Sequence, residues 1–511
     1  MFLKEKMTKS SYSLTKSKIT TGLHCPKKLW FDINDKIKID HFNLHRGNVF
    51  GEKIKELYGD GFDLSNNFDE DIIQLTENAI NDPKVNIIYE GAFLFKETLV
   101  RTDVLIRKPN GWKLIEAKCS ASVKESHKQD IAIQYFVLKN SNIKITEAVI
   151  THLNKEFYYK GNNDYTELKI EVDVLNDIQE YVHLVPNWIN DLTPITYKNS
   201  TKPSIKMGDH CENCQYINIC ESETFPVNID TPISILPFKG NDLKKEWFEK
   251  GIYDLKDLPD KVVQPLKHKR ANFIEILKCH KQEVEWINPK FFEIINSFSW
   301  PRYFFDIESI KQAVPVIPDT KPDDQFPFQY SVHKWENKNQ KLLIKDSLSF
   351  LEFNEDDMDR RFLISLIKNL GEDGPIFAHT ARVEKGAIKY LSNRKNCSDL
   401  KPSIENITNR IVDTEQLLRE NFYNPKMMGS YSLKNIVKAL PKASLYSSEN
   451  NEVGSGGDAM IKWFEYTNPN TSNEQRQKIK DNLITYCAKD TLNLYHIFQY
   501  ILSKENPNER L

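Results

Sequence analysis

Cysteine is scarce in this sequence, which has eight cysteines among 511 residues. A secreted protein held together by disulfides would have a denser set. The sequence also lacks any run of about 18 consecutive apolar residues, which a membrane-spanning helix needs. Its basic N-terminal stretch has no continuous apolar segment of the signal-peptide type. We therefore expect a soluble cytoplasmic protein with no membrane partner, in a reducing compartment where clustered cysteines more often bind metal than form disulfides.

An excess of charge of one sign is also missing, because the formal net charge is −2. A nucleic-acid partner would therefore have to be held by local basic patches or by bound metal ions. Apolar residues make up 40% of the chain and charged residues 28%. This composition is typical of globular proteins with enough apolar side chains for more than one core. At about 150 residues per domain, the length predicts two to four domains.

The sequence pattern changes twice along the chain and so predicts three sections. Residues 1–225 begin and end with cysteine motifs, residues 226–292 have a charged helical pattern, and residues 293–511 open with an apolar strand pattern. Turn-rich polar stretches at 197–209 and 221–232 are the expected linkers. We expect a multidomain α/β protein with a small helical connector in the middle.

The connector has a weak pattern for contact with nucleic acid. Gly240 and Gly251 separate helical runs, an arrangement that faintly resembles a helix-hairpin-helix. Lys267, Lys269 and Arg270 follow these runs and can contact phosphates. The alternative is that these basic residues form an ordinary solvated helix face.

Residues 99–118, LVRTDVLIRKPNGWKLIEAK, predict a β-hairpin, because two β-rich apolar runs flank an Asn-Gly turn. Glu116 and Lys118 alternate along the second strand and share one face, and Asp103 interrupts the first strand. Two carboxylates side by side can hold Mg²⁺ or Mn²⁺, while a lysine orients water or stabilises negative charge. The alternative is an exposed Glu–Lys pair on a sheet edge.

Predicted helices flank this hairpin, over 45–58 with Glu52 and over 128–139 with Gln134 and Tyr135. This order, with D…ExK in the hairpin, resembles the PD-(D/E)XK nucleases, and in particular RecB-like nucleases, including those of CRISPR adaptation. The resemblance covers roughly the first 225 residues and implies a restriction-endonuclease-like fold. The roles that it implies are catalysis by Asp103, Glu116 and Lys118, metal binding by Asp103, Glu116 and Glu52, and substrate binding by Gln134 and Tyr135.

Residues 210–220, HCENCQYINIC, contain three cysteines in the spacing C-x2-C-x5-C, and a fourth cysteine stands early in the chain. The four are Cys25, Cys211, Cys214 and Cys220. One early and three late cysteines around a nuclease section resemble the iron–sulfur subclass of RecB-like nucleases, which implies a [4Fe–4S] cluster. The alternative is Zn²⁺, for which His24 or His210 can replace a thiolate. The remaining cysteines have no partner spacing and are expected to be ordinary thiols: Cys119, Cys279, Cys397 and Cys487.

A second set of carboxylates follows in the last section. RYFFDIES, residues 302–309, reads as an apolar strand on which Asp306 and Glu308 share one face. Burying two like charges together is costly unless a cation compensates them. The alternative is that the strand simply ends at Asp306. Residues 485–501 have a helical pattern that places Tyr486 and Asp490 on one face.

D-x-E on a first strand and Y-x3-D on a late helix resemble the DEDD exonucleases of the RNase H-like fold. The resemblance implies that Asp306, Glu308 and Asp490 bind Mg²⁺ or Mn²⁺, that Tyr486 positions the attacking water, and that trimming runs 3′→5′. The remaining metal ligand of this pattern is Glu384, within 376–391, or Asp413, within 410–418.

The two sections together resemble a bacterial family that joins an iron–sulfur RecB-like nuclease to an RNase H-like exonuclease domain. This resemblance implies a metal-dependent nuclease with two centres, acting on DNA rather than RNA, in DNA processing, repair or defence. The alternative is a nucleic-acid-binding scaffold or adaptor in which one or both centres are degenerate and the cysteines hold a structural zinc ion or iron–sulfur cluster.

Overall fold

The structure is a computed structural model of the chain. It describes residues 13–37, 41–67, 71–211, 214–224, 229–235, 246–247, 250–258, 273–353, 357–441 and 453–505. The predicted phosphate contacts of the connector, Lys267, Lys269 and Arg270, lie outside these residues, as does Gly240.

The chain forms two compact units. The first unit comprises Met1–Glu223 and Gln312–Asp324, and the second comprises Thr224–Lys311 and Gln325–Leu511. The first break therefore falls beside residue 225, where the sequence pattern changes. The sequence did not indicate that residues 312–324, which follow the first strand of the last section, belong to the first unit.

The first unit is built on a seven-stranded sheet in the order β2-β3-β4-β5-β6-β7, with β1 paired to β4. The strands are β1 (Leu14–Thr15), β2 (Phe62–Asp63), β3 (Ile87–Phe95), β4 (Thr98–Lys108), β5 (Gly111–Lys118), β6 (Ile145–Leu153) and β7 (Lys169–Asp173). The pairs β3–β4, β4–β5 and β6–β7 are antiparallel, whereas β1–β4, β2–β3 and β5–β6 are parallel. Strands β4 and β5 form the hairpin that the Asn-Gly turn predicts.

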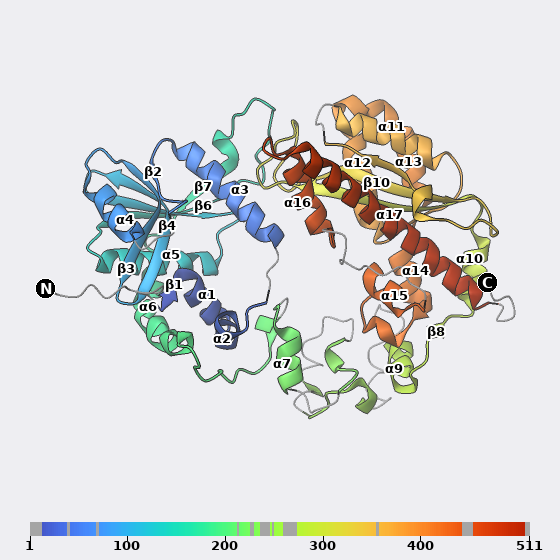
Figure 1. The fold of residues 1–511 in the computed structure, drawn as a ribbon, viewed down its shortest axis with the longest axis horizontal. Coiled ribbons are helices and arrows are strands. Elements are labelled where there is room, and N and C mark those ends of the chain that lie inside the picture. The colour runs from blue at the N-terminus through green and yellow to red at the C-terminus, as the bar shows by residue number, and fades with distance from the viewer. Residues whose placement is uncertain are drawn as a thin grey trace. The chain divides into compact units, whose positions relative to one another are not determined.

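Helices cover both faces of this sheet (Figure 1). They are α1 (Lys16–His24), α2 (Pro26–Asn34), α3 (His41–Tyr58), α4 (Ile72–Asn81), α5 (Glu125–Asn140) and α6 (Gln179–Leu192). Helix α7 (Ile217–Thr224) follows them in the chain. Along β4, Leu105 belongs to an apolar cluster with α1, α4, α5 and α6, whereas its neighbour Val104 belongs to a second cluster with α3. Because side chains alternate along a strand, Asp103 and Glu116 lie on the face that α5 covers.

The second unit is built on a five-stranded mixed sheet in the order β11-β10-β9-β12-β13. Its strands are β9 (Arg302–Lys311), β10 (Gln325–Trp335), β11 (Leu348–Leu351), β12 (Ile376–Ala378) and β13 (Ile411–Asp413), and a separate pair is formed by β8 (Trp286–Ile287) and β14 (Phe422–Tyr423). β9 is antiparallel to β10 and parallel to β12, so it stands at the centre of the sheet.

The longest helix among the described residues is α17 (Asn473–Ser503), which packs on β9 and β10 (Figure 1). The other helices in the described part of this unit are α9 (Phe273–Gln282), α10 (Lys290–Ser297), α11 (Met358–Leu370), α12 (Ala381–Ser392), α13 (Lys401–Arg410), α14 (Thr414–Asn421), α15 (Leu433–Ala439) and α16 (Gly456–Thr467). Phe304 of β9 belongs to an apolar cluster with α9, α10, α15 and α17. Alternation along the strand places Asp306 and Glu308 on this same face, toward α17.

Short 3₁₀ helices connect these elements at Thr166–Leu168, Thr193–Thr196, Asp209–Cys211, Ile233–Ile235, Leu255–Asp257, Ile344–Asp346, Lys395–Leu400 and Pro425–Met427. The prediction of a multidomain α/β protein is confirmed, since each unit combines a mixed sheet with helices. In the described part of the chain, no helix is both long enough and apolar enough to cross a membrane.

Candidate functional site

The first carboxylate centre lies on the β4–β5 hairpin of the first unit. Asp103 projects from β4, and its Oδ2 accepts a hydrogen bond from the backbone N–H of Ala117 at 2.6 Å. Glu116 projects from β5 and is only 1% exposed. Lys118, two residues further along the same strand, contacts Glu116 Oε1 through its Nζ at 2.7 Å. The structure thus brings together the three residues predicted to be catalytic.

Further side chains from two helices saturate the Glu116 carboxylate. Lys16, the first residue of α1, donates from Nζ to Oε1 at 2.6 Å. Gln134 of α5 donates from Nε2 to Oε2 at 2.5 Å, so this predicted substrate-binding residue contacts Glu116 directly. Asp130, one turn earlier on α5, pairs with Lys118. The six residues Asp103, Glu116, Lys118, Lys16, Gln134 and Asp130 are called the first centre below.

Charge within the first centre is largely balanced by its own lysines. Burial alone would raise the pKa of Glu116, but the ammonium groups of Lys16 and Lys118 hold it well below its usual range. Burial and the charge of Glu116 raise the pKa of Asp103 to about 7. Burial opposes the charged form of both lysines, yet Glu116 raises the pKa of each. At neutral pH Glu116 is therefore ionised and Asp103 is readily protonated.

Two residues predicted for this site do not join it. Glu52 of α3 has a side chain that is 67% exposed and pairs with Lys55 at 2.7 Å. Its helical neighbours Phe50 and Ile54 pack in the cluster on the opposite face of the sheet from the carboxylates. Tyr135 packs against the apolar cluster beside α5.

The four predicted metal-binding cysteines line one small cavity of the first unit. They reach it from the end of α1 (Cys25), from the short helix at Asp209–Cys211 (Cys211), from the following turn (Cys214) and from α7 (Cys220). Four thiols facing one cavity fit either an iron–sulfur cluster or a zinc ion as a donor set. Burial raises the pKa of the Cys211 and Cys220 thiols, and the neighbouring cysteines add to this shift.

Aromatic side chains form part of the wall of this cysteine cavity. Phe31 and Tyr216 stack with their ring centroids 4.8 Å apart, and both line the cavity together with His210. Tyr216 is fully buried, and its hydroxyl donates to Asp32 at 2.6 Å. An apolar wall of this kind limits the access of water to a bound metal.

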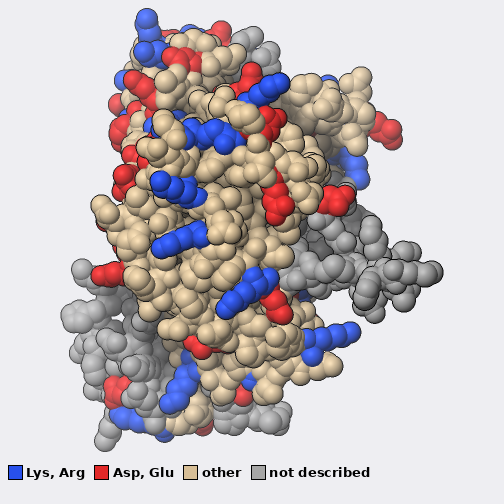
Figure 2. Space-filling model, turned by 90° about the vertical axis from the view of Figure 1, so that its left-hand side faces the viewer, with Lys and Arg blue, Asp and Glu red and all other residues tan. Residues whose placement is uncertain are grey.

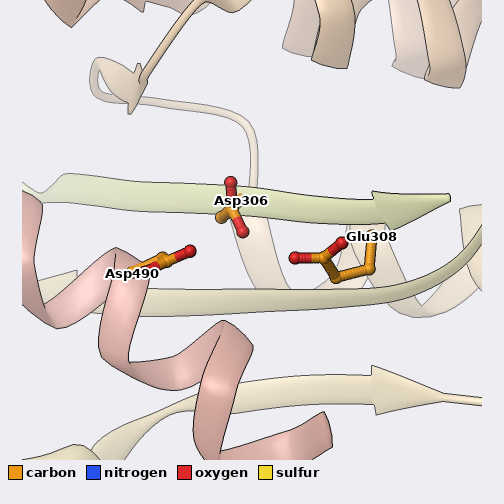
Figure 3. A group of neighbouring side chains, drawn as sticks. All are labelled: Asp306, Glu308 and Asp490. Atoms are coloured by element: carbon orange, nitrogen blue, oxygen red, sulfur yellow. The ribbon is translucent and has the colours of Figure 1, made fainter. Parts of the chain in front are cut away.

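The second centre lies where β9 meets α17 in the second unit. Figure 3 shows Asp306 and Glu308 projecting from the strand and Asp490 from the helix, with their carboxylates turned toward one another. One oxygen from each lies within 4.8 Å of the others. Glu308 and Asp490 are each 7% exposed. This spacing lets three carboxylates share one divalent cation.

Glu384, near the start of α12, is the fourth acidic residue of this centre. It is 5% exposed, and its Oε2 is buried without a hydrogen-bond partner. Asp413, the other candidate for the same role, caps α14, because its side chain accepts a hydrogen bond from the backbone N–H of Gln416 at 3.0 Å. Glu384 therefore offers an unused oxygen, whereas Asp413 has a structural partner. Asp306, Glu308, Asp490 and Glu384 are called the second centre below.

Burial and mutual repulsion raise the pKa values of the carboxyl groups in the second centre. Burial raises the pKa values of Asp306 and Glu308 far above their usual range, and Asp490 raises both further. The pKa of Glu384 is raised by burial and by Asp306. Among the described side chains, no lysine or arginine contributes to these three shifts. A cation bound by these carboxylates would offset their mutual repulsion.

Two further residues of α17 border this centre. Tyr486, the predicted water-positioning residue, is 7% exposed and lies one turn before Asp490. Cys487 is fully buried, and its thiol points to Asp306 Oδ2 at 3.7 Å. The sequence reading treated Cys487 as an ordinary thiol, because no spacing rule connects it to Asp306.

Lys16 and Asp130 were also missed from the sequence. Asp130 stands four residues before Gln134 on a predicted helix. Residues four apart share one helix face, so this spacing could have indicated that Asp130 lies near the site. Lys16 had no local signal, because it lies 100 residues from Glu116 in the sequence.

Basic and acidic side chains are interspersed on the surface that Figure 2 shows, where lysine and arginine lie among aspartate and glutamate. This mixture agrees with the small net charge of the chain. The chemistry of the molecule is therefore better sought in the buried centres than on this face.

Comparisons with known proteins give few matches. Residues 303–432 match the model of a domain of unknown function, DUF2779. No curated protein matches the chain. Among solved structures, the chain is similar to one titled "Crystal structure of SSO0001", with 17% sequence identity, coverage of 40% of this chain and 93% of that chain, and a TM-score of 0.17.

Proposed function

We propose that the protein is a metal-dependent nuclease with two catalytic centres, acting on DNA. The observation that carries this proposal is the second centre, in which carboxylate oxygens of Asp306, Glu308 and Asp490 lie within 4.8 Å of one another. Glu384, whose charge acts on Asp306 and Glu308, adds a buried oxygen without a hydrogen-bond partner. Buried carboxylates of this number are costly unless a cation joins them. The D-x-E strand and Y-x3-D helix that hold them support an RNase H-like exonuclease fold for the second unit and 3′→5′ trimming.

Divalent cations at the second centre would polarise the scissile phosphate and help to ionise a water molecule. Asp306, Glu308, Asp490 and Glu384 would hold them through carboxylate oxygens. Tyr486, one turn from Asp490, would orient the attacking water with its hydroxyl. The central position of β9 fixes Asp306 and Glu308 within the sheet, so their carboxylates need little rearrangement.

At the first centre, Asp103 and Glu116 would share a cation, while Lys118 orients water or stabilises the negative charge that develops on the phosphate. Gln134 holds one oxygen of Glu116 and thereby sets the direction of the other. The hairpin and the flanking helices α3 and α5 support a PD-(D/E)XK fold for the first unit.

The four cysteines, in this proposal, hold a [4Fe–4S] cluster that stabilises the first unit. Anaerobic purification should yield a brown protein that contains iron and acid-labile sulfide. A colourless protein containing zinc would replace the cluster by a structural zinc ion and leave the nuclease proposal intact.

The decisive experiment is cleavage of end-labelled DNA, single-stranded and double-stranded, with Mg²⁺ or Mn²⁺ and with RNA of the same sequence as a comparison. Asp306→Asn should abolish trimming from the 3′ end, Lys118→Ala should abolish cleavage by the first centre, and the combined variant should be inactive. If the combined variant cleaves as fast as the wild type, both sites are wrong. Binding of DNA without metal-dependent cleavage in the wild type would favour the scaffold alternative.

A further inference from the structure

One short helix connects the first centre to the cysteine cavity. Helix α1 begins at Lys16, whose Nζ contacts Glu116, and ends at His24, directly before Cys25. Cys25 lines the cavity with the other three cysteines. At 1.5 Å per residue the nine residues of α1 span about 13 Å. The two sites thus lie at opposite ends of a single rigid element.

Local contacts make α1 move as one body. Thr15 caps its start by accepting a hydrogen bond from the backbone N–H of Lys18, and the Cys25 N–H closes its end on the Thr21 carbonyl at 2.9 Å. Gly22 lies so close to α6 that an added Cβ would stand 2.6 Å from the side chain of Leu192. A displacement at Cys25 would therefore be transmitted along the helix to Lys16.

Lys16 differs from an ordinary surface ion pair. It reaches the same oxygen of Glu116 that Lys118 contacts, and the charges of Asp103 and Asp130 also act on it. Its ammonium group lies 2.6 Å from Glu116 Oε1, and a divalent cation bound to Glu116 would compete for this carboxylate. Lys16 therefore both orients Glu116 and opposes a cation that approaches it.

We propose that Lys16 is a positioning residue of the first centre and that the metal held by the four cysteines fixes it there through α1. This inference rests on the proposed function, because it assumes that the first centre binds a divalent cation. The cysteine-bound metal would then control the cation affinity of a centre to which it contributes no ligand.

The first test measures Mn²⁺ binding to the full chain by electron paramagnetic resonance, in an Asp306→Asn/Asp490→Asn background that disables the second centre. Lys16→Met should tighten Mn²⁺ binding about tenfold, because an opposing charge is removed. Lys18→Met is the matched control, since Lys18 lies on the same helix but donates to the Ser13 carbonyl at 2.9 Å. Equal affinities in Lys16→Met and the control would overturn the role given to Lys16.

The second test removes the cysteine-bound metal by Cys25→Ser and, separately, by Cys220→Ser, which lies outside α1. Both should shift Mn²⁺ affinity in the direction of Lys16→Met, and neither should shift it further when combined with Lys16→Met. Additive shifts, or unchanged affinity in variants whose circular dichroism is that of the wild type, would overturn the coupling.

Gly22→Ala provides a variant that keeps all four cysteines and Lys16. Its added methyl group would stand 2.6 Å from the end of the Leu192 side chain, so either Leu192 rotates or α1 moves. Where α1 moves, Mn²⁺ affinity should again shift in the same direction, with the cysteine-bound metal retained. If the cysteine variants fail to fold, this variant tests the coupling between α1 and the first centre instead. An affinity equal to that of the parent, in a variant whose α1 backbone amide NMR shifts differ from those of the parent, would overturn the coupling. If Asp103→Asn has the same Mn²⁺ affinity as its parent, the first centre binds no cation and the proposed function of that centre fails instead.

Discussion

Glu116 in the first unit is contacted by two lysines and a glutamine, whereas Asp306 in the second unit has Glu308, Asp490 and Glu384 as its charged neighbours. Both groups lie on strands of mixed sheets and face a helix, Glu116 buried and Asp306 partly buried. The difference lies in the source of positive charge. The first centre takes it from Lys16 and Lys118, whereas no lysine or arginine among the described side chains contributes to the pKa shifts of the second centre.

This difference predicts two kinds of metal dependence. A centre that contains its own cations is stable without metal, and a divalent ion must compete with lysines to enter it. A centre in which carboxylates repel one another gains stability when a cation binds to them. Substitutions in one centre, compared with matched substitutions in the other, therefore test this difference.

The largest effect is expected from Asp490→Asn. Losing one of three clustered carboxylates should lower 3′→5′ trimming by roughly 10²–10³-fold, because the site can no longer hold its cations in place. Lys118→Ala serves as the control and should leave this trimming unchanged. The measurement is the rate of release of labelled nucleotides in Mg²⁺. Equal losses in the two variants would mean that the centres act as one.

Neutralising a carboxylate should change metal-free stability with opposite signs in the two centres. Glu116→Gln leaves Lys16 and Lys118 without their shared counter-ion and should cost about 3 kcal/mol. Asp306→Asn relieves repulsion from Asp490 and should stabilise by about 1–2 kcal/mol. Urea unfolding in the presence of a chelator, followed separately for each unit, tests both. A loss of stability in Asp306→Asn would show that its charge is compensated after all.

The metal-free protein should also lose stability as the pH rises from about 4 to 7. The pKa of Asp103 is raised to about 7, so the folded state holds this proton more tightly than the unfolded state does. That contribution is complete below the unfolded pKa and is lost as the pH rises through the folded one, on the order of 4 kcal/mol. The pKa values of Asp306 and Glu308 are also raised, so deprotonation of these two residues likewise lowers stability as the pH rises.

Thermal unfolding at pH 5 and pH 8, with and without Mg²⁺, measures this dependence. Saturating Mg²⁺ should flatten it, because the cation takes the place of the protons. Asp103→Asn should remove the contribution of the first centre. A metal-free protein whose stability rises between these pH values would contradict the direction of all three shifts.

Local periodicity predicted much of this arrangement. Asp306 and Glu308 are two residues apart on an apolar strand, and Tyr486 and Asp490 are four apart on a helix, so each pair was correctly placed on one face. The Asn-Gly turn likewise predicted the hairpin that unites Asp103 with Glu116. These features depend on short spacings, which fix side-chain direction before any tertiary contact forms.

Long-range packing was not predictable by the same reasoning. Lys16 reaches Glu116 because β1 pairs with β4 and directs α1 toward the hairpin, an outcome that no local pattern specifies. Cys487 meets Asp306 only because α17 packs on β9. The choice between Glu384 and Asp413 also required the structure, since it depends on which carboxylate already caps a helix.

The smallest effect is expected from Glu52→Gln. Each centre has one predicted helix-borne glutamate, but Glu384 is 5% exposed and lies beside Asp306, while the Glu52 side chain is 67% exposed and pairs with Lys55. An exposed pair between residues i and i+3 contributes at most about 0.5 kcal/mol. Glu52→Gln should therefore leave both cleavage by the first centre and stability within about 0.5 kcal/mol of the wild type. A loss of cleavage as large as that of Lys118→Ala would mean that α3 turns Glu52 toward Asp103 when metal and DNA bind.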